Sequence, residues 1–272
     1  MAHYYNQGAV TGDFNPKDSL ALGESAAAKA VALDDSLPEA HWTLSGAVFM
    51  NRWDLTWAQR ELKRALELDP RFADAYNLDA MELTALNRYA EAIEAERKAL
   101  ELEPRSHPWK MLEILSEARQ YDAALENGKQ RIESNPQDPG LYYMMMDTYR
   151  RKGMYKEAVD ALIKLNEVTN NHKEIAALKK ACSQYGNKGG LIRRALTLAQ
   201  ESARKGYVPP VDFAVLYAQL GDRERTIGLL EEGFKEHSPR MLWIQTEPAY
   251  DFLHSDPRYV SLIQRIGLPL AR

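Results

Sequence analysis

Four acidic residues are the candidates for chemistry in this chain: Asp79, Glu82, Glu113 and Asp147. Asp79 and Glu82 lie three residues apart, so on a helix their carboxylates would share neighbouring parts of one face. A buried carboxylate without a partner is costly, and we therefore expect Asp79 to find a hydrogen-bond donor or to reach solvent. A structural ion pair is the simplest interpretation. The alternative is an acidic strip of all four residues that binds a cation or a basic ligand, or that serves acid–base catalysis.

The other residues with chemical potential lack the spacing that their chemistry requires. The six histidines form no His-x-x-x-His pair, so we expect no local metal site and place them at the surface or at helix caps. The single cysteine, Cys182, shares an apolar helical face with Ile175 and Leu178 and is expected to be buried and structural. The glycine-rich run at 186–190 lacks the Lys-Ser/Thr ending of a phosphate-binding loop and is expected to form a turn between helices. We predict no metal, no cofactor and no enzymatic activity.

The composition narrows the class of protein. The chain has 272 residues, of which 45% are hydrophobic, and it carries 35 Lys and Arg against 39 Asp and Glu. This profile is typical of a folded domain, and the net charge of −4 gives no reason to expect a nucleic-acid or membrane partner. No run of about 18 apolar residues is present. One cysteine allows no intrachain disulfide, which favours a cytoplasmic location.

The chain repeats itself at intervals close to 34 residues. Pro70 and Pro104 close two similar phrases 34 residues apart, and Pro136 closes a weaker third phrase 32 residues later. A small residue recurs upstream of these phrases and once beyond them, at intervals of 34, 32 and 34 residues, at Ala58, Ala92, Ala124 and Ala158. Two further periods beyond Ala158 lead to Thr226, so the register continues through a degenerate stretch. An internal period of this length indicates a repeat architecture.

Each unit has the apolar pattern of helices, with apolar residues at i, i+3, i+4 and i+7 or nearby and no competing alternation of period two. Four N-cap residues directly before a proline mark helix starts, namely Asn15-Pro16, Asp138-Pro139, Ser238-Pro239 and Asp256-Pro257. An extra residue interrupts the repeat around Arg52-Trp53-Asp54. The predicted helices span residues 17–34, 39–51, 55–68, 73–86, 90–102, 108–119, 122–134, 139–152, 156–169, 173–185, 190–205, 210–220, 223–236 and 257–266.

These repeats resemble the tetratricopeptide repeat, in which two amphipathic helices are followed by a proline. The resemblance implies an all-α fold, an α-α superhelix (TPR solenoid) of about six helix-turn-helix repeats with a C-terminal capping helix, because each unit must stack on the next to bury its apolar face. We expect one domain over 1–272, with an incomplete first repeat at 1–37, regular repeats at 38–171, degenerate repeats at 172–238 and a C-terminal cap at 239–272.

The chain also resembles the C-terminal repeat regions of bacterial multidomain regulators. The resemblance includes the opening at Asp34-Asp35-Ser36-Leu37-Pro38 and the close between Ser255 and Pro269. Because Tyr4 to Gly8 is similar to the tail of a helix whose beginning is absent, the chain is expected to be part of a larger protein. These features favour a role as the sensor or assembly part of a regulatory system.

The family resemblance implies that the first helix of each repeat lines a concave groove. Transferred position by position, the expected partner-binding residues are Trp42, Phe49, Asn77, Met81, Trp109, Glu113, Tyr143, Asp147, Arg150 and Arg151. Aromatic and Arg side chains are the usual anchors of an interface, although Trp42 and Trp109 could instead pack between helices.

The predicted function is therefore a protein-interaction scaffold that binds a peptide or a partner helix in this groove. The alternative is an enzyme or a cation or small-ligand binder that uses the acidic strip. Self-association is a further expectation, because an incomplete first repeat would leave the N-terminal end of the stack without a polar cap.

Overall fold

A computed structural model describes the backbone of residues 16–104 and 109–270, with side chains from Ser19 onward. The partial helix expected at Tyr4 to Gly8 lies outside the described residues, as do His3 and His107. Within the described ranges, no helix combines the length and the apolar character needed to cross a membrane.

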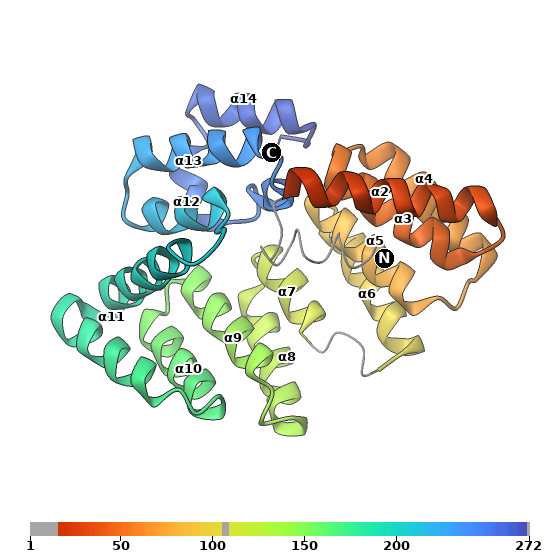
Figure 1. Ribbon diagram of the computed structural model, residues 1–272. Coiled ribbons are helices and arrows are strands. Elements are labelled where there is room, and N and C mark those ends of the chain that lie inside the picture. The colour runs from red at the N-terminus through yellow and green to blue at the C-terminus, as the bar shows by residue number, and fades with distance from the viewer. Residues whose placement is uncertain (1–15, 105–108, 271–272) are drawn as a thin grey trace.

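All regular structure in the described residues is helical, and no strand occurs there (Figure 1). The α-helices are α2 (Pro16–Leu33), α3 (Pro38–Arg52), α4 (Leu55–Leu68), α5 (Ala73–Ala85), α6 (Tyr89–Leu102), α7 (Lys110–Glu117), α8 (Tyr121–Ser134), α9 (Pro139–Lys152), α10 (Tyr155–Val168), α11 (His172–Ala203), α12 (Pro210–Gln219), α13 (Arg223–Lys235) and α14 (Pro257–Ile266). Two 3₁₀ helices, η1 (Pro239–Trp243) and η2 (Pro248–Leu253), lie between α13 and α14.

The predicted capping pairs gave helix starts of two kinds. Asp138 and Asp256 accept hydrogen bonds from the backbone N–H groups of Gly140 and Arg258, as expected of N-caps before proline. Ser238 makes no such bond, and the helix that begins at Pro239 is a short 3₁₀ helix. That prediction was wrong in kind because the segment after Ser238 packs into the core, with Met241 and Leu242 almost fully buried.

Helix α11 folds back on itself at Gly186, which has a φ of 70° and a ψ of 171°. The guanidinium of Arg194 lies 2.5 Å from the carboxylate of Glu174, whereas twenty residues of straight helix would separate them by about 30 Å. The two limbs approach closely because a Cβ at position 190 would lie 2.5 Å from the backbone of Cys182, and only glycine fits there. The predicted turn between helices at 186–190 is confirmed.

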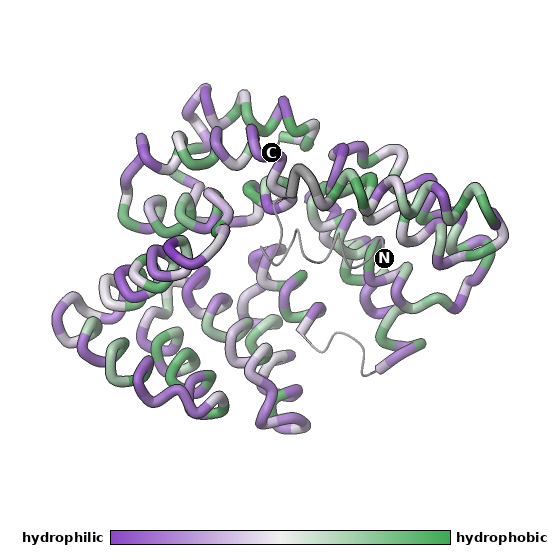
Figure 2. Tube along the Cα trace, viewed as in Figure 1, coloured by the Kyte–Doolittle hydropathy of each residue, from purple (hydrophilic) through white to green (hydrophobic). Residues whose placement is uncertain are grey.

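The small residues of the sequence repeat lie where successive helices touch. Ala58, Ala92, Ala124 and Ala158 are all fully buried, and Thr226, two periods further on, is fully buried as well. A small side chain at this place lets the neighbouring helix approach. Along most helices, short groups of hydrophobic residues are interspersed with hydrophilic ones, as expected of helices with one buried side (Figure 2). The small residues that mark the repeat in the sequence therefore also mark where successive helices pack together.

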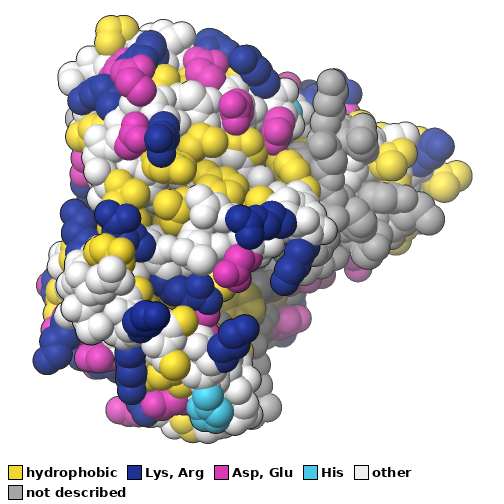
Figure 3. All heavy atoms as spheres, turned by 60° about the vertical axis from the view of Figure 1, so that its left-hand side comes forward, with side chains coloured by type: hydrophobic (Ala, Val, Ile, Leu, Met, Phe, Trp, Pro, Cys, Tyr) yellow, Lys and Arg dark blue, Asp and Glu magenta, His cyan; other side chains and the backbone are white. Residues whose placement is uncertain are grey.

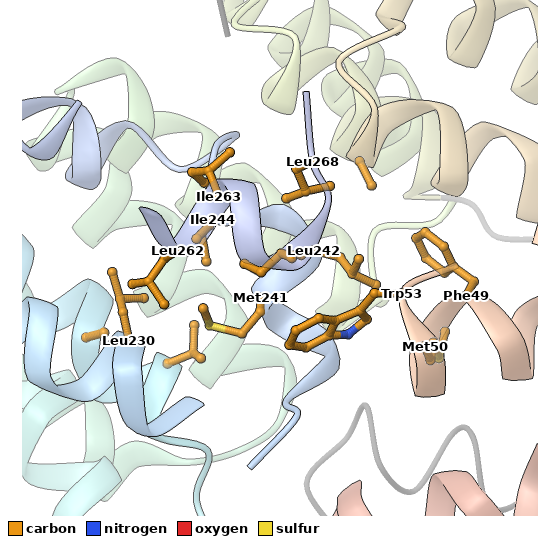
Figure 4. Close-up of a cluster of buried hydrophobic side chains, with 14 of the residues drawn as sticks. Phe49, Met50, Trp53, Leu230, Met241, Leu242, Ile244, Leu262, Ile263 and Leu268 are labelled. Carbon is orange, nitrogen blue, oxygen red and sulfur yellow. The ribbon is translucent and has the colours of Figure 1, made fainter. Parts of the chain in front are cut away.

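The stack of helices curves until its last elements meet its first ones. One hydrophobic cluster includes Phe49 and Trp53 from the end of α3 together with Met241 from η1 and Leu262 from α14. Figure 4 shows the indole of Trp53 pointing from α3 toward Met241 and Leu242. Figure 1 shows η1, α13 and α14 returned beside the start of α2. The two ends of the solenoid thus share one core.

Candidate interaction surface

Helices α3, α5, α7 and α9 are the first helices of successive repeats, and each lies beside the next. They carry the ten side chains expected in the groove. The structure divides these residues by their position along the helices. Those near the C-terminal ends contact the protein's own C-terminal segment, and most of those in the N-terminal halves do not.

Phe49, near the end of α3, is fully buried. Its ring packs edge-on against Trp243 of η1, with 5.7 Å between ring centroids. The next aromatic residue along the chain, Trp53, stacks on His237 at 3.7 Å and adopts a left-handed φ of 56°. Phe49 is therefore part of the closure between the two ends of the solenoid and offers no surface to a partner in this structure.

Arg150 and Arg151, at the end of α9, also hold the C-terminal segment. The guanidinium of Arg150 donates to both carboxylate oxygens of Glu247, at 3.0 and 2.8 Å, and Arg151 donates to the carbonyl of Thr246 at 3.0 Å. Both arginines also donate to Asp147, at 2.8 and 2.7 Å. This network bridges residues almost one hundred positions apart.

The carboxylates of this network stay ionised. Burial alone would raise the pKa of Asp147, but the charges of Arg150 and Arg151 more than offset burial and hold that pKa below its ordinary value. The pKa of Glu247 is lowered in the same way. A third contact of this kind joins the turn after α7 to η2, where the guanidinium of Arg119 donates to both oxygens of Asp251.

The N-terminal halves of the same helices form the rest of the inner face, together with Met81 from the second half of α5. We call the residues there the open inner surface: Trp42, Asn77, Met81, Trp109, Glu113 and Tyr143. Tyr143 is 53% exposed, and the others are half-buried. Trp42 packs against Phe72 with ring centroids 5.5 Å apart, which agrees with the interpretation that it packs between helices. Asn77 donates to Glu96 at 3.0 Å, and Lys110 donates to Glu113 at 2.6 Å.

The four residues of the predicted acidic strip lie in separate environments. Glu113 and Asp147 are ion-paired, to Lys110 and to the two arginines of α9. Asp79 makes no ion pair among the described residues, so the expected pair is wrong for this residue, and burial raises its pKa to about 6. No group of three or more His, Cys, Asp or Glu in the described part of the chain is arranged to hold a metal ion.

Glu82 is fully buried between three helices and has no cationic partner among the described residues. The Ser45 hydroxyl lies 2.8 Å from a Glu82 carboxyl oxygen and 2.8 Å from the carbonyl of Ala58. Because a hydroxyl carries one proton, it can donate to only one of them. A protonated Glu82 completes the chain, since it donates to Ser45, and Ser45 donates to Ala58.

The electrostatic environment of Glu82 supports this protonation. Burial raises the pKa of Glu82 to about 8; donation from Ser45 to the ionised carboxylate would oppose that change, and the nearby charge of Asp79 on the same helix adds to it. Helices α3 and α4 present the uncharged Ser45 and the carbonyl of Ala58 to this group. Glu82 is therefore a neutral hydrogen-bond donor that joins α3, α4 and α5.

We expect Glu82→Gln to stabilise the protein at pH 8, because an amide can donate to Ser45 without binding a proton. The folded protein holds the Glu82 proton more tightly than the unfolded chain. The stabilisation that protonated Glu82 gives the wild type is therefore complete below pH 4.5 and is lost as the pH rises toward 8. The wild type should lose up to about 1.4 kcal/mol of unfolding free energy per pH unit relative to the variant. Urea unfolding at pH 5, 6.5 and 8 measures the difference. The exposed Glu101→Gln is the control, and an equal pH slope in both variants would show that Glu82 is ionised.

Two histidines depart from the expectation of surface or capping positions. His41 is buried, with Nδ1 2.8 Å from Glu61 and Nε2 3.0 Å from the carbonyl of Asp35. His237 is half-buried under the ring of Trp53, and this burial lowers its pKa. Both were misjudged because their partners lie on other elements. Cys182 is half-buried rather than buried, and burial raises the pKa of its thiol.

Four residues that occupy the C-terminal half of the inner face were not predicted from the sequence: Trp53, Trp243, Glu247 and Asp251. One signal was present, because Glu247-Pro248 is a fifth capping pair, and Glu247 does accept from the backbone N–H of Ala249 at 3.0 Å. Nothing in the local pattern shows that this cap also binds Arg150.

Known proteins resemble this chain in the architecture just described. Residues 115–182, from α7 into the first limb of α11, match a family model described as "Tetratricopeptide repeat". This segment of the chain is therefore similar to the tetratricopeptide repeat. Among curated proteins, none matches the sequence.

Several solved structures are similar to this chain. PilW, a widely conserved type IV pilus biogenesis factor, is 14% identical, with 96% of this chain and 98% of that chain covered and a TM-score of 0.50. PilF of Pseudomonas aeruginosa is 17% identical over 90% of this chain and 95% of its own, with a TM-score of 0.47. YrrB, a tetratricopeptide repeat protein with an unusual peptide-binding site, is 18% identical over 81% and 96%, with a TM-score of 0.42. The similarity to PilW shows a shared helical-repeat fold over nearly the whole chain.

Proposed function

We propose that this chain is a non-enzymatic protein-interaction scaffold that binds a peptide or a partner helix on the open inner surface. One observation carries the proposal. The C-terminal ends of the inner helices are occupied by η1 and η2, while Tyr143 on α9 stays 53% exposed. A partner that approaches the inner face therefore meets the N-terminal halves of α3, α5, α7 and α9.

The chemistry of this surface suits a polypeptide ligand. Exposed tyrosine supplies a large contact area at a small cost in side-chain entropy, and half-buried Trp109 and Met81 on the preceding repeats add apolar area. Asn77 and the Lys110–Glu113 pair offer polar groups at the edges. Arg150 and Arg151, first expected to bind the partner, instead fix the floor of the groove by binding Glu247.

Tyr143→Ala should weaken binding of a peptide ligand at least tenfold, because truncating a central aromatic anchor typically costs about 2 kcal/mol or more. Peptides selected from a displayed library on the wild-type protein provide the ligands, and fluorescence anisotropy gives their affinities. Leu33→Ala removes another exposed hydrophobic side chain, at the end of α2, and serves as the control. If the selected peptides bind Tyr143→Ala as tightly as the wild type, the binding surface lies elsewhere.

Such a scaffold would serve as the assembly part of a regulatory system, and the single cysteine is compatible with a cytoplasmic location. Self-association through the N-terminal end stays a prediction, which sedimentation velocity can test.

A further inference from the structure

The hairpin of α11 is basic in a chain that is acidic elsewhere. Between residues 173 and 205 there are eight Lys and Arg but only two Asp and Glu. The chain as a whole has 35 Lys and Arg against 39 Asp and Glu, so the remainder has 27 basic and 37 acidic residues. The sign of the charge therefore changes from one part of the molecule to another.

Most of the positive charges of the hairpin make no ion pair among the described residues. Across the described residues, the one ion pair that involves α11 joins Arg194 to Glu174. Lys179, Lys180, Lys188 and Arg193 are exposed and make no ion pair with the described part of the chain. Arginines of α14, by contrast, are paired with Glu224 and Glu231 on α13.

Apolar side chains accompany these charges. Tyr185 is 46% exposed at the tip of the hairpin, where the guanidinium of Arg193 lies over its ring at 4.6 Å, and Leu198 is 38% exposed on the second limb. Figure 3 brings this side of the molecule forward. Lys and Arg predominate over its lower half, and a band of hydrophobic side chains lies above them. Basic and apolar groups on one surface can contact a partner that offers both acidic and apolar groups.

We propose that the α11 hairpin is a second interaction surface, which binds an acidic segment of a partner protein that also carries apolar side chains. The size of the hairpin favours a short protein segment over larger anionic partners. Each limb is roughly 20–25 Å long, so a short segment can lie entirely on positive surface. A nucleic acid or an anionic membrane extends further and would also meet the acidic remainder of the chain, which repels it.

The test uses a synthetic fluorescein-labelled peptide of fourteen residues in which pairs of Glu alternate with single Leu. We expect it to bind the wild-type chain in low salt, with an affinity that falls as the salt concentration rises. The triple variant Lys179→Glu, Lys180→Glu and Arg193→Glu should bind it at least tenfold more weakly. These side chains are exposed, so the variant should fold, and circular dichroism with a thermal melt verifies this.

A matched triple variant reverses three exposed lysines on other helices, Lys63→Glu, Lys129→Glu and Lys156→Glu, and should keep at least half of the affinity. Tyr143→Ala should also leave this binding unchanged, which separates it from the open inner surface. Equal loss in both triple variants, or no binding of the peptide by the wild type, would overturn the proposal. A 20-mer DNA duplex or vesicles rich in phosphatidylserine that bind more tightly than the peptide would overturn it as well.

Discussion

Replacing Trp53 by Ala should lower the free energy of unfolding by about 3–5 kcal/mol, although the residue lies in the turn between the two helices of one repeat. Its indole is 8% exposed, stacks on His237 and contacts Phe234 with ring centroids 5.5 Å apart. The substitution leaves a cavity where the first and last repeats meet, and the surrounding elements cannot collapse to fill it without opening the closure.

Urea unfolding at equilibrium measures this loss, and hydrogen exchange locates it. Amide protons of η1 and η2 should exchange faster in the variant, because Met241 and Leu242 pack against the same cluster. Trp57→Ala is the matched control, since Trp57 is half-buried on α4 and its indole N–H donates to Glu61 on the same helix. A loss for Trp53→Ala no larger than for Trp57→Ala would contradict the closed arrangement.

Arg150→Met should also cost about 3–5 kcal/mol, because it leaves the buried carboxylate of Glu247 without its main partner. The side chains of Arg150 and Glu247 are only 12% and 10% exposed, so solvent screens their interaction weakly. Removing the carboxylate as well, in the double variant with Glu247→Gln, should recover part of the loss. The coupling free energy from this double-mutant cycle measures the contact directly.

The effect of Arg150→Met should depend on pH with a definite sign. The folded-state pKa values of Asp147 and Glu247 lie below their unfolded values, so the stabilisation is present above about pH 4.5 and is lost as the pH falls below it. The exposed pair of Arg97 and Glu94 is the control, because its loss in Arg97→Met should cost less than about 1 kcal/mol. Additive effects of Arg150→Met and Glu247→Gln would show that the two side chains do not interact.

The fold was predictable from the sequence because its signals are local. The small residues at Ala58, Ala92 and Ala124 mark the contact between successive helices, and capping residues such as Asp138 mark where helices begin. Each of these features acts within about one repeat, and a single sequence displays it. Gly186 and Gly190 are local signals as well, because the turn at Gly186 and the close approach of the two α11 limbs at Gly190 both require glycine.

The inner face was less predictable because it depends on where the stack ends. Family positions placed Tyr143 and Asn77 on the inner side, but they could not show that the chain returns to cover Phe49 or Arg150. That return is the sum of small rotations over many repeats, and it joins residues such as Arg151 and Thr246 that are 95 positions apart. The extra residue at Trp53 is an irregularity that the sequence displays, yet its role depends on His237 and Phe234 at the far end of the stack.

Small-angle X-ray scattering of the purified chain tests the closed arrangement most directly, because the open inner surface exists only if the C-terminal segment covers the rest of the inner face. A chain of this length that closes on itself should have a radius of gyration of about 19 Å and a nearly symmetric distribution of interatomic distances. An extended distribution with a clearly larger radius would show an open solenoid, in which Phe49, Arg150 and Arg151 face solvent and the proposed division of the inner face does not exist.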